Sequence, residues 1–228
     1  APTFAQADVQ IIHNSGDPDA RVVDVYIETG GSVAQKLENV EYRTASGFLT
    51  VPDGTYDVTI AESNSTGPND ATLKEFTGVS LSGGTNYTVV VNGVANPADF
   101  DTGENSSSEI ALDLDVVPNA QPMGTSGDNT VEIRAVHGVT DAPTVDIQDG
   151  ADNVLFDDAS YGGITPYVDA TAGTITLKVT PGDDANNTAV ATFTDVPLGN
   201  FEENTLTVLA SGFLSTGNEN TDDDRPVA

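Results

Sequence analysis

Apolar and polar residues alternate along most of the chain in short stretches rich in Val, Ile, Thr and Tyr. Such alternation is typical of strands with one buried face. Clusters of Gly, Pro, Asn and Asp between the stretches have the composition of turns. No window has the periodicity of an amphipathic helix of about three turns. The predicted strands are Val9–Ile12, Val22–Ile27, Tyr56–Ile60, Tyr87–Val91, Ile110–Val116, Val131–Val136, Thr174–Val179 and Leu206–Ala210.

The chain also repeats itself. The motif Val9–Asn14, which contains His13, returns as Ile133–Gly138, which contains His137. Downstream, the two halves stay in register at a spacing of about 119 residues, the mark of an internal duplication. Each copy has roughly 110 residues, enough for a hydrophobic core of its own.

The alternation and the repeat together predict an all-β protein of two tandem β-sandwich domains. This arrangement fits the strand spacing better than one large barrel. We expect the first repeat at 1–118 and the second at 130–228. The stretch 119–129, rich in Pro, Gly and small polar residues, is the expected linker.

The two copies differ at their ends. The first continues past Gly93 through an acidic loop into the strand-like segment Glu109–Val116, whereas in the second the acidic loop Thr221–Arg225 is followed by Pro226–Ala228. We therefore expect the second repeat to lack its last strand. The simpler explanation is an end trimmed from a longer chain. An unpaired sheet edge invites a strand from another chain, which would build an assembly.

The net charge of the chain limits the kinds of partner that it can bind. Seven Lys and Arg stand against 36 Asp and Glu, for a formal net charge of −29. Such a field repels nucleic acids and anionic lipid, so we expect neither as a partner, and it favours solubility in salt. Cysteine is absent, which excludes disulfides, thiolate metal sites and Cys nucleophiles. No apolar run reaches the length of a membrane span.

The histidines are the first candidates for chemistry. His13 and His137 each end the first strand of a copy, with an Asp four residues on and Asp24 or Asp146 on the next strand. A carboxylate that orients an imidazole is the beginning of acid–base or metal chemistry. The sequence offers no nucleophile elbow and too few zinc ligands. We therefore expect a structural role for all four residues, with each His bridging a loop to a neighbouring strand.

Acidic loops are the second candidates. Carboxylates in flexible turns suit calcium, which takes six to eight oxygen ligands. None of the loops reproduces an EF-hand or a calcium-binding nonapeptide repeat. Calcium is therefore a weak expectation, and no other cofactor is predicted. The weak calcium candidates are Asp17, Asp19, Asp99, Asp101, Asp149 and Asp152.

Aromatic residues are the third candidates, since sugar-binding sandwiches present exposed aromatic platforms. The chain has no Trp. Tyr42 and Tyr161 are equivalent across the repeat, as are Phe48 and Tyr167. Because all four lie on strand-like stretches, we expect core packing for them. A glycan partner stays open without direct support.

Several segments resemble a known family, the domain of unknown function 4397 family. The first copy matches through Val9–Ser15, Val23–Tyr26, Tyr42–Ala45, Leu49–Tyr56 and Tyr87–Val94, and the second through Val136–Ile147 and Thr207–Phe213. The resemblance implies immunoglobulin-like β-sandwiches and an extracellular setting. Tandem copies resemble secreted surface proteins that Gram-negative bacteria export by type IX secretion. The resemblance supplies no catalytic residues.

We therefore expect a non-enzymatic secreted or cell-surface protein that acts in structure or adhesion. It would form an extracellular assembly, for instance a filament, by pairing sheet edges with a protein partner or with itself. The alternative is a carbohydrate- or peptide-binding module of a secreted system. The fold class does not decide between these functions.

Overall fold

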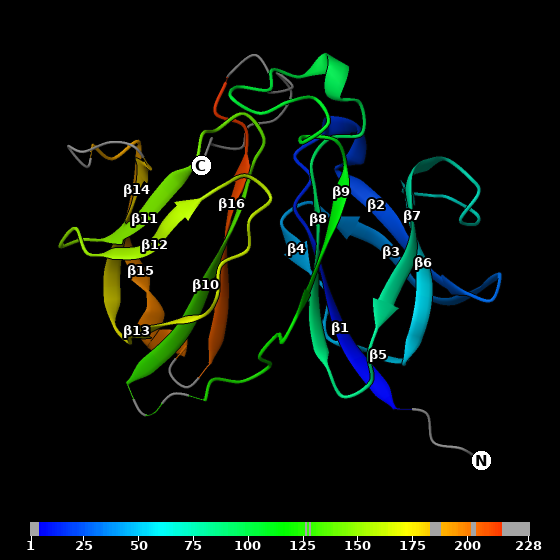
Figure 1. The fold of residues 1–228 in the computed structure, drawn as a ribbon, viewed down its shortest axis with the longest axis horizontal. Helices are drawn as coiled ribbons and strands as arrows, with labels where there is room; N and C mark the ends of the chain where they lie inside the picture. The colour runs from blue at the N-terminus through cyan, green and yellow to red at the C-terminus, as the bar shows by residue number, and fades with distance from the viewer. Residues whose placement is uncertain (1–4, 126, 128, 183–187, 202–203, 216–228) are drawn as a thin grey trace. The chain divides into compact units, whose positions relative to one another are not determined.

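The computed structural model describes residues 5–125, 127, 129–182, 188–201 and 204–215. The chain divides into two compact units (Figure 1). The first comprises Ala1–Phe100 and Ser107–Ala120, and the second comprises Asp101–Ser106 and Gln121–Ala228. Each unit is built from two separate sheets, which confirms the all-β sandwich prediction.

One sheet of the first unit has β1 at its centre. The strand β1 pairs in parallel with β8, and β8 pairs antiparallel with β9 at the edge. Two short strands, β4 and β5, pair with the other side of β1. The bounds are β1 Gln6–His13, β4 Thr44–Ala45, β5 Leu49–Pro52, β8 Asn86–Asn92 and β9 Asp113–Pro118.

The other sheet of the first unit is antiparallel throughout, in the order β3-β2-β6-β7. The core lies between the two sheets, because alternate residues of each strand point to the same face. Ile11 of β1, Val25 of β2 and Ile60 of β6 are buried together in it. The bounds are β2 Val22–Thr29, β3 Ser32–Glu41, β6 Gly54–Glu62 and β7 Thr72–Leu81, with short 3-10 helices at Pro18–Ala20 and Pro97–Asp99.

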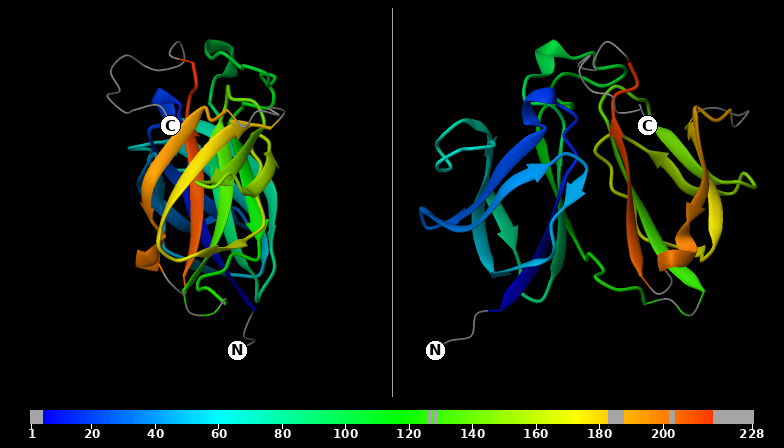
Figure 2. Two further views of the ribbon diagram at one scale, coloured as in Figure 1. Left: turned by 90° about the vertical axis from the view of Figure 1, so that its left-hand side faces the viewer. Right: turned by 180° about the vertical axis from the view of Figure 1, so that it is seen from behind.

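The second unit repeats this architecture (Figure 2). One sheet has the order β13-β10-β16, with β10 and β16 parallel, and the other has the order β12-β11-β14-β15. Ile133 of β10 and Phe156 of β12 are buried in its core. The bounds are β10 Thr130–Val139, β11 Val145–Asp149, β12 Val154–Ala159, β13 Val168–Thr171, β14 Thr174–Pro181, β15 Ala191–Pro197 and β16 Thr205–Gly212, with a 3-10 helix at Leu198–Phe201.

The units differ at one sheet edge. In the first unit β8 lies between β1 and β9, whereas β16, its counterpart, pairs with β10 alone among the described strands. The residues after Ser215, on which the prediction of a missing last strand falls, lie outside the described part of the chain.

Most of the predicted strands are confirmed, and the exception is Ile110–Val116. Strand β9 begins only at Asp113, and Ala111 makes an isolated bridge to Val94 instead. In the described ranges no helix is long and apolar enough to cross a membrane. One residue of the predicted linker, Gln121, is bound to a strand: its carbonyl accepts a hydrogen bond from Thr205 Oγ1 of β16 at 2.5 Å.

Candidate functional site

His13 lies at the end of β1 and is completely buried. Its Nε2 lies 2.6 Å from the carbonyl oxygen of Ala20, and the backbone N–H of Ser15 donates to its Nδ1 at 3.4 Å. A carbonyl only accepts, so Nε2 carries the proton and the ring is neutral. Burial lowers the pKa of His13, an effect that the bond to Ala20 partly offsets.

His137 repeats this geometry at the end of the long strand β10. Its Nε2 lies 3.0 Å from the Pro143 carbonyl oxygen, and the N–H of Val139 donates to its Nδ1 at 3.3 Å. Burial lowers its pKa as well. In both units the ring joins a strand end to the following loop, and both ring nitrogens are bonded to backbone atoms.

The Asp four residues after each His tethers another segment. Asp17 accepts from the backbone N–H of Ala95 at 2.7 Å, and Asp141 accepts from the N–H groups of Leu214 and Ser215 at 2.6 and 2.7 Å. Ala95 and Leu214 are equivalent, since they lie one repeat spacing apart in the sequence. These carboxylates hold the chain where it leaves β8 and β16.

Asp24 and Asp146 stabilise irregular points in the neighbouring strands. Asp24 accepts from the N–H of Asn39 and Asp146 from the N–H of Asp158, at 2.9 and 2.8 Å. Asn39 and Asp158 have left-handed φ angles of 54° and 49°. Lys36 also contacts Asp24, at 3.1 Å. Burial acts to raise the pKa of Asp24, but its hydrogen bonds outweigh burial and lower it.

The weak calcium candidates are scattered over separate loops rather than brought together. Most of their carboxylates are used within their own loops: Asp17 accepts from the N–H of Asp19, Asp99 from Asn96, Asp101 from the N–H of Gly103, Asp149 from Ala151 and Asn153, and Asp152 pairs with Lys178. These contacts are those of ordinary Asp-containing turns.

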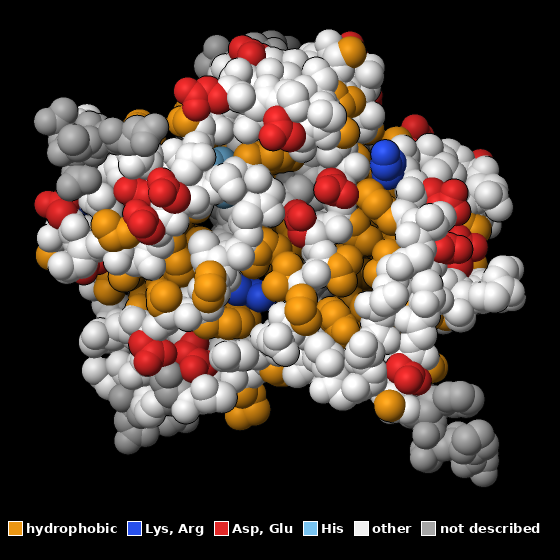
Figure 3. Space-filling view, viewed as in Figure 1, with side chains coloured by type: hydrophobic (Ala, Val, Ile, Leu, Met, Phe, Trp, Pro, Cys, Tyr) orange, Lys and Arg blue, Asp and Glu red, His pale blue; other side chains and the backbone are white. Residues whose placement is uncertain are grey.

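A different acidic cluster does converge. Carboxylate oxygens of Asp146, Asp157 and Asp158 lie within 4.8 Å of one another. The sequence showed the Asp157–Asp158 pair but gave no sign that Asp146 would join it. Exposed acidic groups are common on this protein, and in Figure 3 they are dispersed over the visible face. Proximity alone therefore does not make this cluster a metal site.

The aromatic pairs divide between core and surface. Tyr42 is buried and its ring lies 6.3 Å from that of His13, in an edge contact that Tyr161 repeats with His137. Phe48 is 37% exposed, so the prediction of core packing is wrong for this residue. Its equivalent, Tyr167, is only partly buried.

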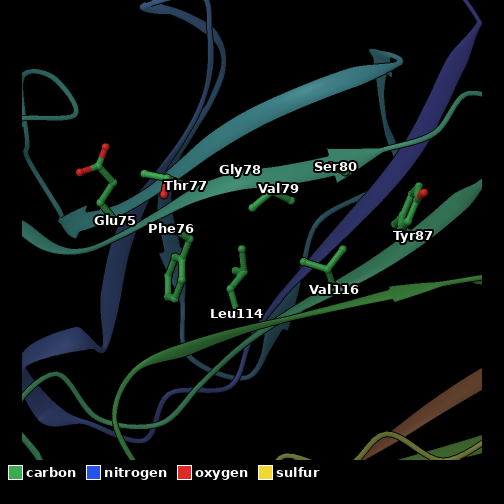
Figure 4. Close-up of a pocket in the computed structure, with 9 residues that line it drawn as sticks. All are labelled: Glu75, Phe76, Thr77, Gly78, Val79, Ser80, Tyr87, Leu114 and Val116. Carbon is green, nitrogen blue, oxygen red and sulfur yellow. The ribbon is translucent and has the colours of Figure 1, made fainter.

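The first unit carries a groove between β7 and β9 (Figure 4). Its volume is about 600 Å³, and side chains from β7, β8 and β9 line it. Phe76 and Val79 of β7 face Leu114 and Val116 of β9, with Tyr87 of β8 at one end. All these side chains also pack on the core of the unit. The strand β9 therefore pairs with β8 and forms the side of the groove opposite β7.

The strand β16 is the equivalent of β8, but its two edges differ from those of β8. The Asn204 carbonyl accepts a hydrogen bond from the Glu132 N–H of β10. Alternate residues of β16 therefore bond to β10. The residues between them, including Thr207 and Leu209, direct their backbone N–H and C=O groups away from β10. The matching groups in β8 face β9. Val89 and Val91 are 4% and 0% exposed, whereas their equivalents in β16 are only partly buried. Among the described strands, none other than β10 pairs with β16.

Comparisons with known proteins identify the family of this chain. No curated protein matches the chain. A solved structure of a leucine-rich repeat protein from Bacteroides thetaiotaomicron matches with 14% identity and a TM-score of 0.20, covering 93% of this chain and 27% of that one. The chain thus spans about a quarter of that protein, and so low a TM-score supports no inference from it. A family model, described as Domain of unknown function (DUF4397), matches residues 7–113 and again residues 131–225. The chain therefore belongs to this family and contains two tandem copies of its domain.

Proposed function

We propose that the chain is a non-enzymatic secreted or cell-surface protein with a structural or adhesive role, joined to its partner by strand addition at β16. One observation carries this proposal. The same sheet position is covered by β9 in the first unit and left open in the described part of the second. Strand addition uses such an edge, because its backbone groups give affinity and its alternate side chains give specificity.

The buried polar groups support a role without catalysis. His13 and His137 use both ring nitrogens on backbone atoms and are held neutral by burial. A general base needs a free ring nitrogen within reach of a substrate. The scaffold therefore uses its most reactive side chains for its own rigidity.

The test is the assembly state of the protein isolated from its native cell without denaturant. Replacing Leu209 by Pro removes an N–H that faces away from β10, so it should block strand addition while the pairing with β10 persists. Leu209→Ala is the matched control, since it shortens the side chain and keeps the N–H. We expect large species in electron microscopy and light scattering for the wild type and for L209A, and single chains for L209P.

Two results would contradict the proposal. One is wild-type protein that stays a single chain over a wide concentration range and carries no bound strand. The other is L209P protein that assembles as fully as L209A. Circular dichroism of each variant shows whether the sandwich fold is retained.

The alternative function, peptide binding by a monomer, is favoured by the groove of the first unit. Its lining combines the apolar Phe76, Val79, Leu114 and Val116 with the polar Glu75, Thr77 and Ser80, a mixture that a peptide can match with its side chains and backbone. Single chains that bind peptides, with binding lost in Phe76→Ser but not in Phe193→Ser, would support this alternative over assembly.

A further inference from the structure

The groove of the first unit lies between the edge strands of its two sheets. The strand β7 ends the order β3-β2-β6-β7, and β9 ends the order β4-β1-β8-β9. Apolar side chains of β7 face those of β9 across the groove (Figure 4). Its volume of about 600 Å³ is in the size range of ligand sites.

A β-bulge in β7 shapes this groove. Between Phe76 and Val79, β7 has one residue more than its partner strand β6. Both side chains therefore point inward and pack on the core, although they are three positions apart in the sequence. Within the bulge, the N–H of Gly78 donates to Asp57 Oδ1 at 3.0 Å. This bond interrupts the edge of β7, so a ligand would depend on the side chains of the groove more than on a continuous ladder of backbone bonds.

The strands around the groove carry an excess of negative charge. Glu75 lies at one end of the groove (Figure 4), and β9 adds Asp113 and Asp115. Lys74 is the one basic residue in β7, β8 and β9. Burial raises the pKa of Asp115, the hydrogen bond from Asn92 lowers it, and the charge of Asp113 raises it further. The surroundings of the groove therefore favour a ligand with positive charge.

The charge of the chain itself points to a ligand from another polypeptide. Only seven of the 228 residues are Lys or Arg. The residues outside the described ranges include one basic residue, Arg225, which directly follows the acidic run Asp222–Asp224. Like charges that meet across a contact are unfavourable. A basic segment of a partner avoids this repulsion, whereas an acidic segment of this chain does not.

We propose that the groove between β7 and β9 binds a short extended segment of a basic protein. Two apolar side chains of the segment, two positions apart, insert between the apolar side chains of β7 and those of β9, and a Lys or Arg lies beside Glu75. Such side chains share one face of an extended segment, about 7 Å apart. The inference rests on the alternative function, peptide binding, and specifies its ligand. It does not depend on strand addition at β16.

The probe is a short capped peptide with a fluorescent label, in which Lys alternates with Val and Leu, added to the full chain. One control peptide has Glu in place of Lys. A second control has the composition of the probe but groups its apolar residues together, which removes the alternation. Fluorescence anisotropy measures binding in about 0.1 M and about 1 M salt, where the Debye length is about 10 Å and about 3 Å.

We expect the probe to bind at least about tenfold more tightly than either control peptide in about 0.1 M salt. Glu75→Gln should weaken binding of the probe about twofold to fivefold in about 0.1 M salt and have little effect in about 1 M salt, because an exposed ion pair is weak and screened. Glu41→Gln is the matched variant, since Glu41 is exposed on β3, at the opposite edge of the same sheet. It makes the same change of charge and should bind like the wild type.

The apolar part of the site is tested separately. Phe76→Ser should weaken binding of the probe about tenfold or more at both salt concentrations, because it removes apolar contact. The matched variant is Val33→Ser, since Val33 is 44% exposed on β3. Circular dichroism shows whether each variant keeps its fold, and Glu75→Gln tests the site even if Phe76→Ser does not fold.

The outcomes separate this inference from the functions proposed above. Equal binding of the Lys and Glu peptides, weakened in Phe76→Ser, would overturn the inference and leave peptide binding standing. Binding of the probe that neither Glu75→Gln nor Phe76→Ser weakens would overturn it as well, because the peptide would then lie elsewhere on the acidic surface. Absence of binding by every peptide would overturn both this inference and peptide binding by the groove, including the case in which this chain itself covers the groove. Strand addition at β16 would stand in all three cases.

Discussion

At the scale of single residues, the two copies preserve a set of buried polar groups that bind the backbone. His13 and His137 fix the loop after the first strand, while Asp17 and Asp141 fix the segment after β8 or β16. An unpaired polar group in such places costs about 1 to 3 kcal/mol, so each partner contributes to stability. The repeated His and Asp positions in the sequence reflect this shared scaffold.

The histidines predict how stability depends on pH. Their folded pKa values lie below the ordinary 6.5, so the unfolded chain binds more protons as the pH falls. The stability that comes from burying the neutral rings is therefore fully present above about pH 6.5 and is lost as the pH falls below it. A tenfold difference in proton affinity between the folded and unfolded chains corresponds to about 1.4 kcal/mol of stability.

The variant His13→Gln tests this dependence. Urea unfolding at a series of pH values should show a smaller loss of stability between about pH 7 and pH 5 for the first unit of H13Q than for the wild type. His137→Gln is the matched variant for the second unit. Equal pH slopes in all three proteins would mean that protonation of the buried rings is not coupled to unfolding.

At the scale of elements, the start of the long connection from β8 to β9 depends on a glycine. Gly93 has a φ of 85°, and a Cβ added there would lie 2.7 Å from the Ile110 carbonyl oxygen and would also clash with Ala111. Gly84 has a similar φ of 80° with nothing within 4 Å of an added Cβ. Alanine variants at these two glycines therefore distinguish backbone strain from crowding against the segment that leads into β9.

We expect Gly84→Ala to lower the free energy of unfolding by about 1 kcal/mol, from backbone strain alone. Gly93→Ala should cost about 3 kcal/mol or more, since the added carbon also displaces the segment before β9. Denaturant unfolding of the first unit measures both. Equal losses in the two variants would show that β9 adapts to the added carbon without cost.

The sequence predicted central strands better than edge strands. Central strands such as β1, β8 and β10 are mostly buried, so their Val- and Ile-rich segments mark them in the sequence. The edge strands β3, β7 and β15 are mostly exposed and polar, so no alternation marks them. The groove beside β7 could not be predicted for the same reason.

At the scale of the whole molecule, the excess of acidic residues produces repulsion within the folded protein. Seven basic side chains cannot balance 36 acidic ones, and this imbalance was readable from composition alone. Which carboxylates lie buried and bonded could not be read from it. Asp24 and Asp146 depend on strand irregularities that only the fold reveals.

Screening should therefore stabilise the protein. We expect the thermal midpoint to rise when monovalent salt increases from about 0.02 M to about 1 M, because the Debye length falls to about 3 Å. Sodium and choline chlorides should act alike, and circular dichroism measures the midpoint. A midpoint that stays constant or falls would show that self-repulsion does not limit stability.

The most direct test of the central claim is amide hydrogen exchange in the free chain, compared between equivalent positions of the two units. Thr88 and Val90 of β8 face β9, whereas Thr207 and Leu209 of β16 face away from β10. The account predicts slow exchange at the first pair and rapid exchange at the second. Equally slow exchange at both pairs would mean that β16 is already covered, and the second unit would then have no edge to offer a partner.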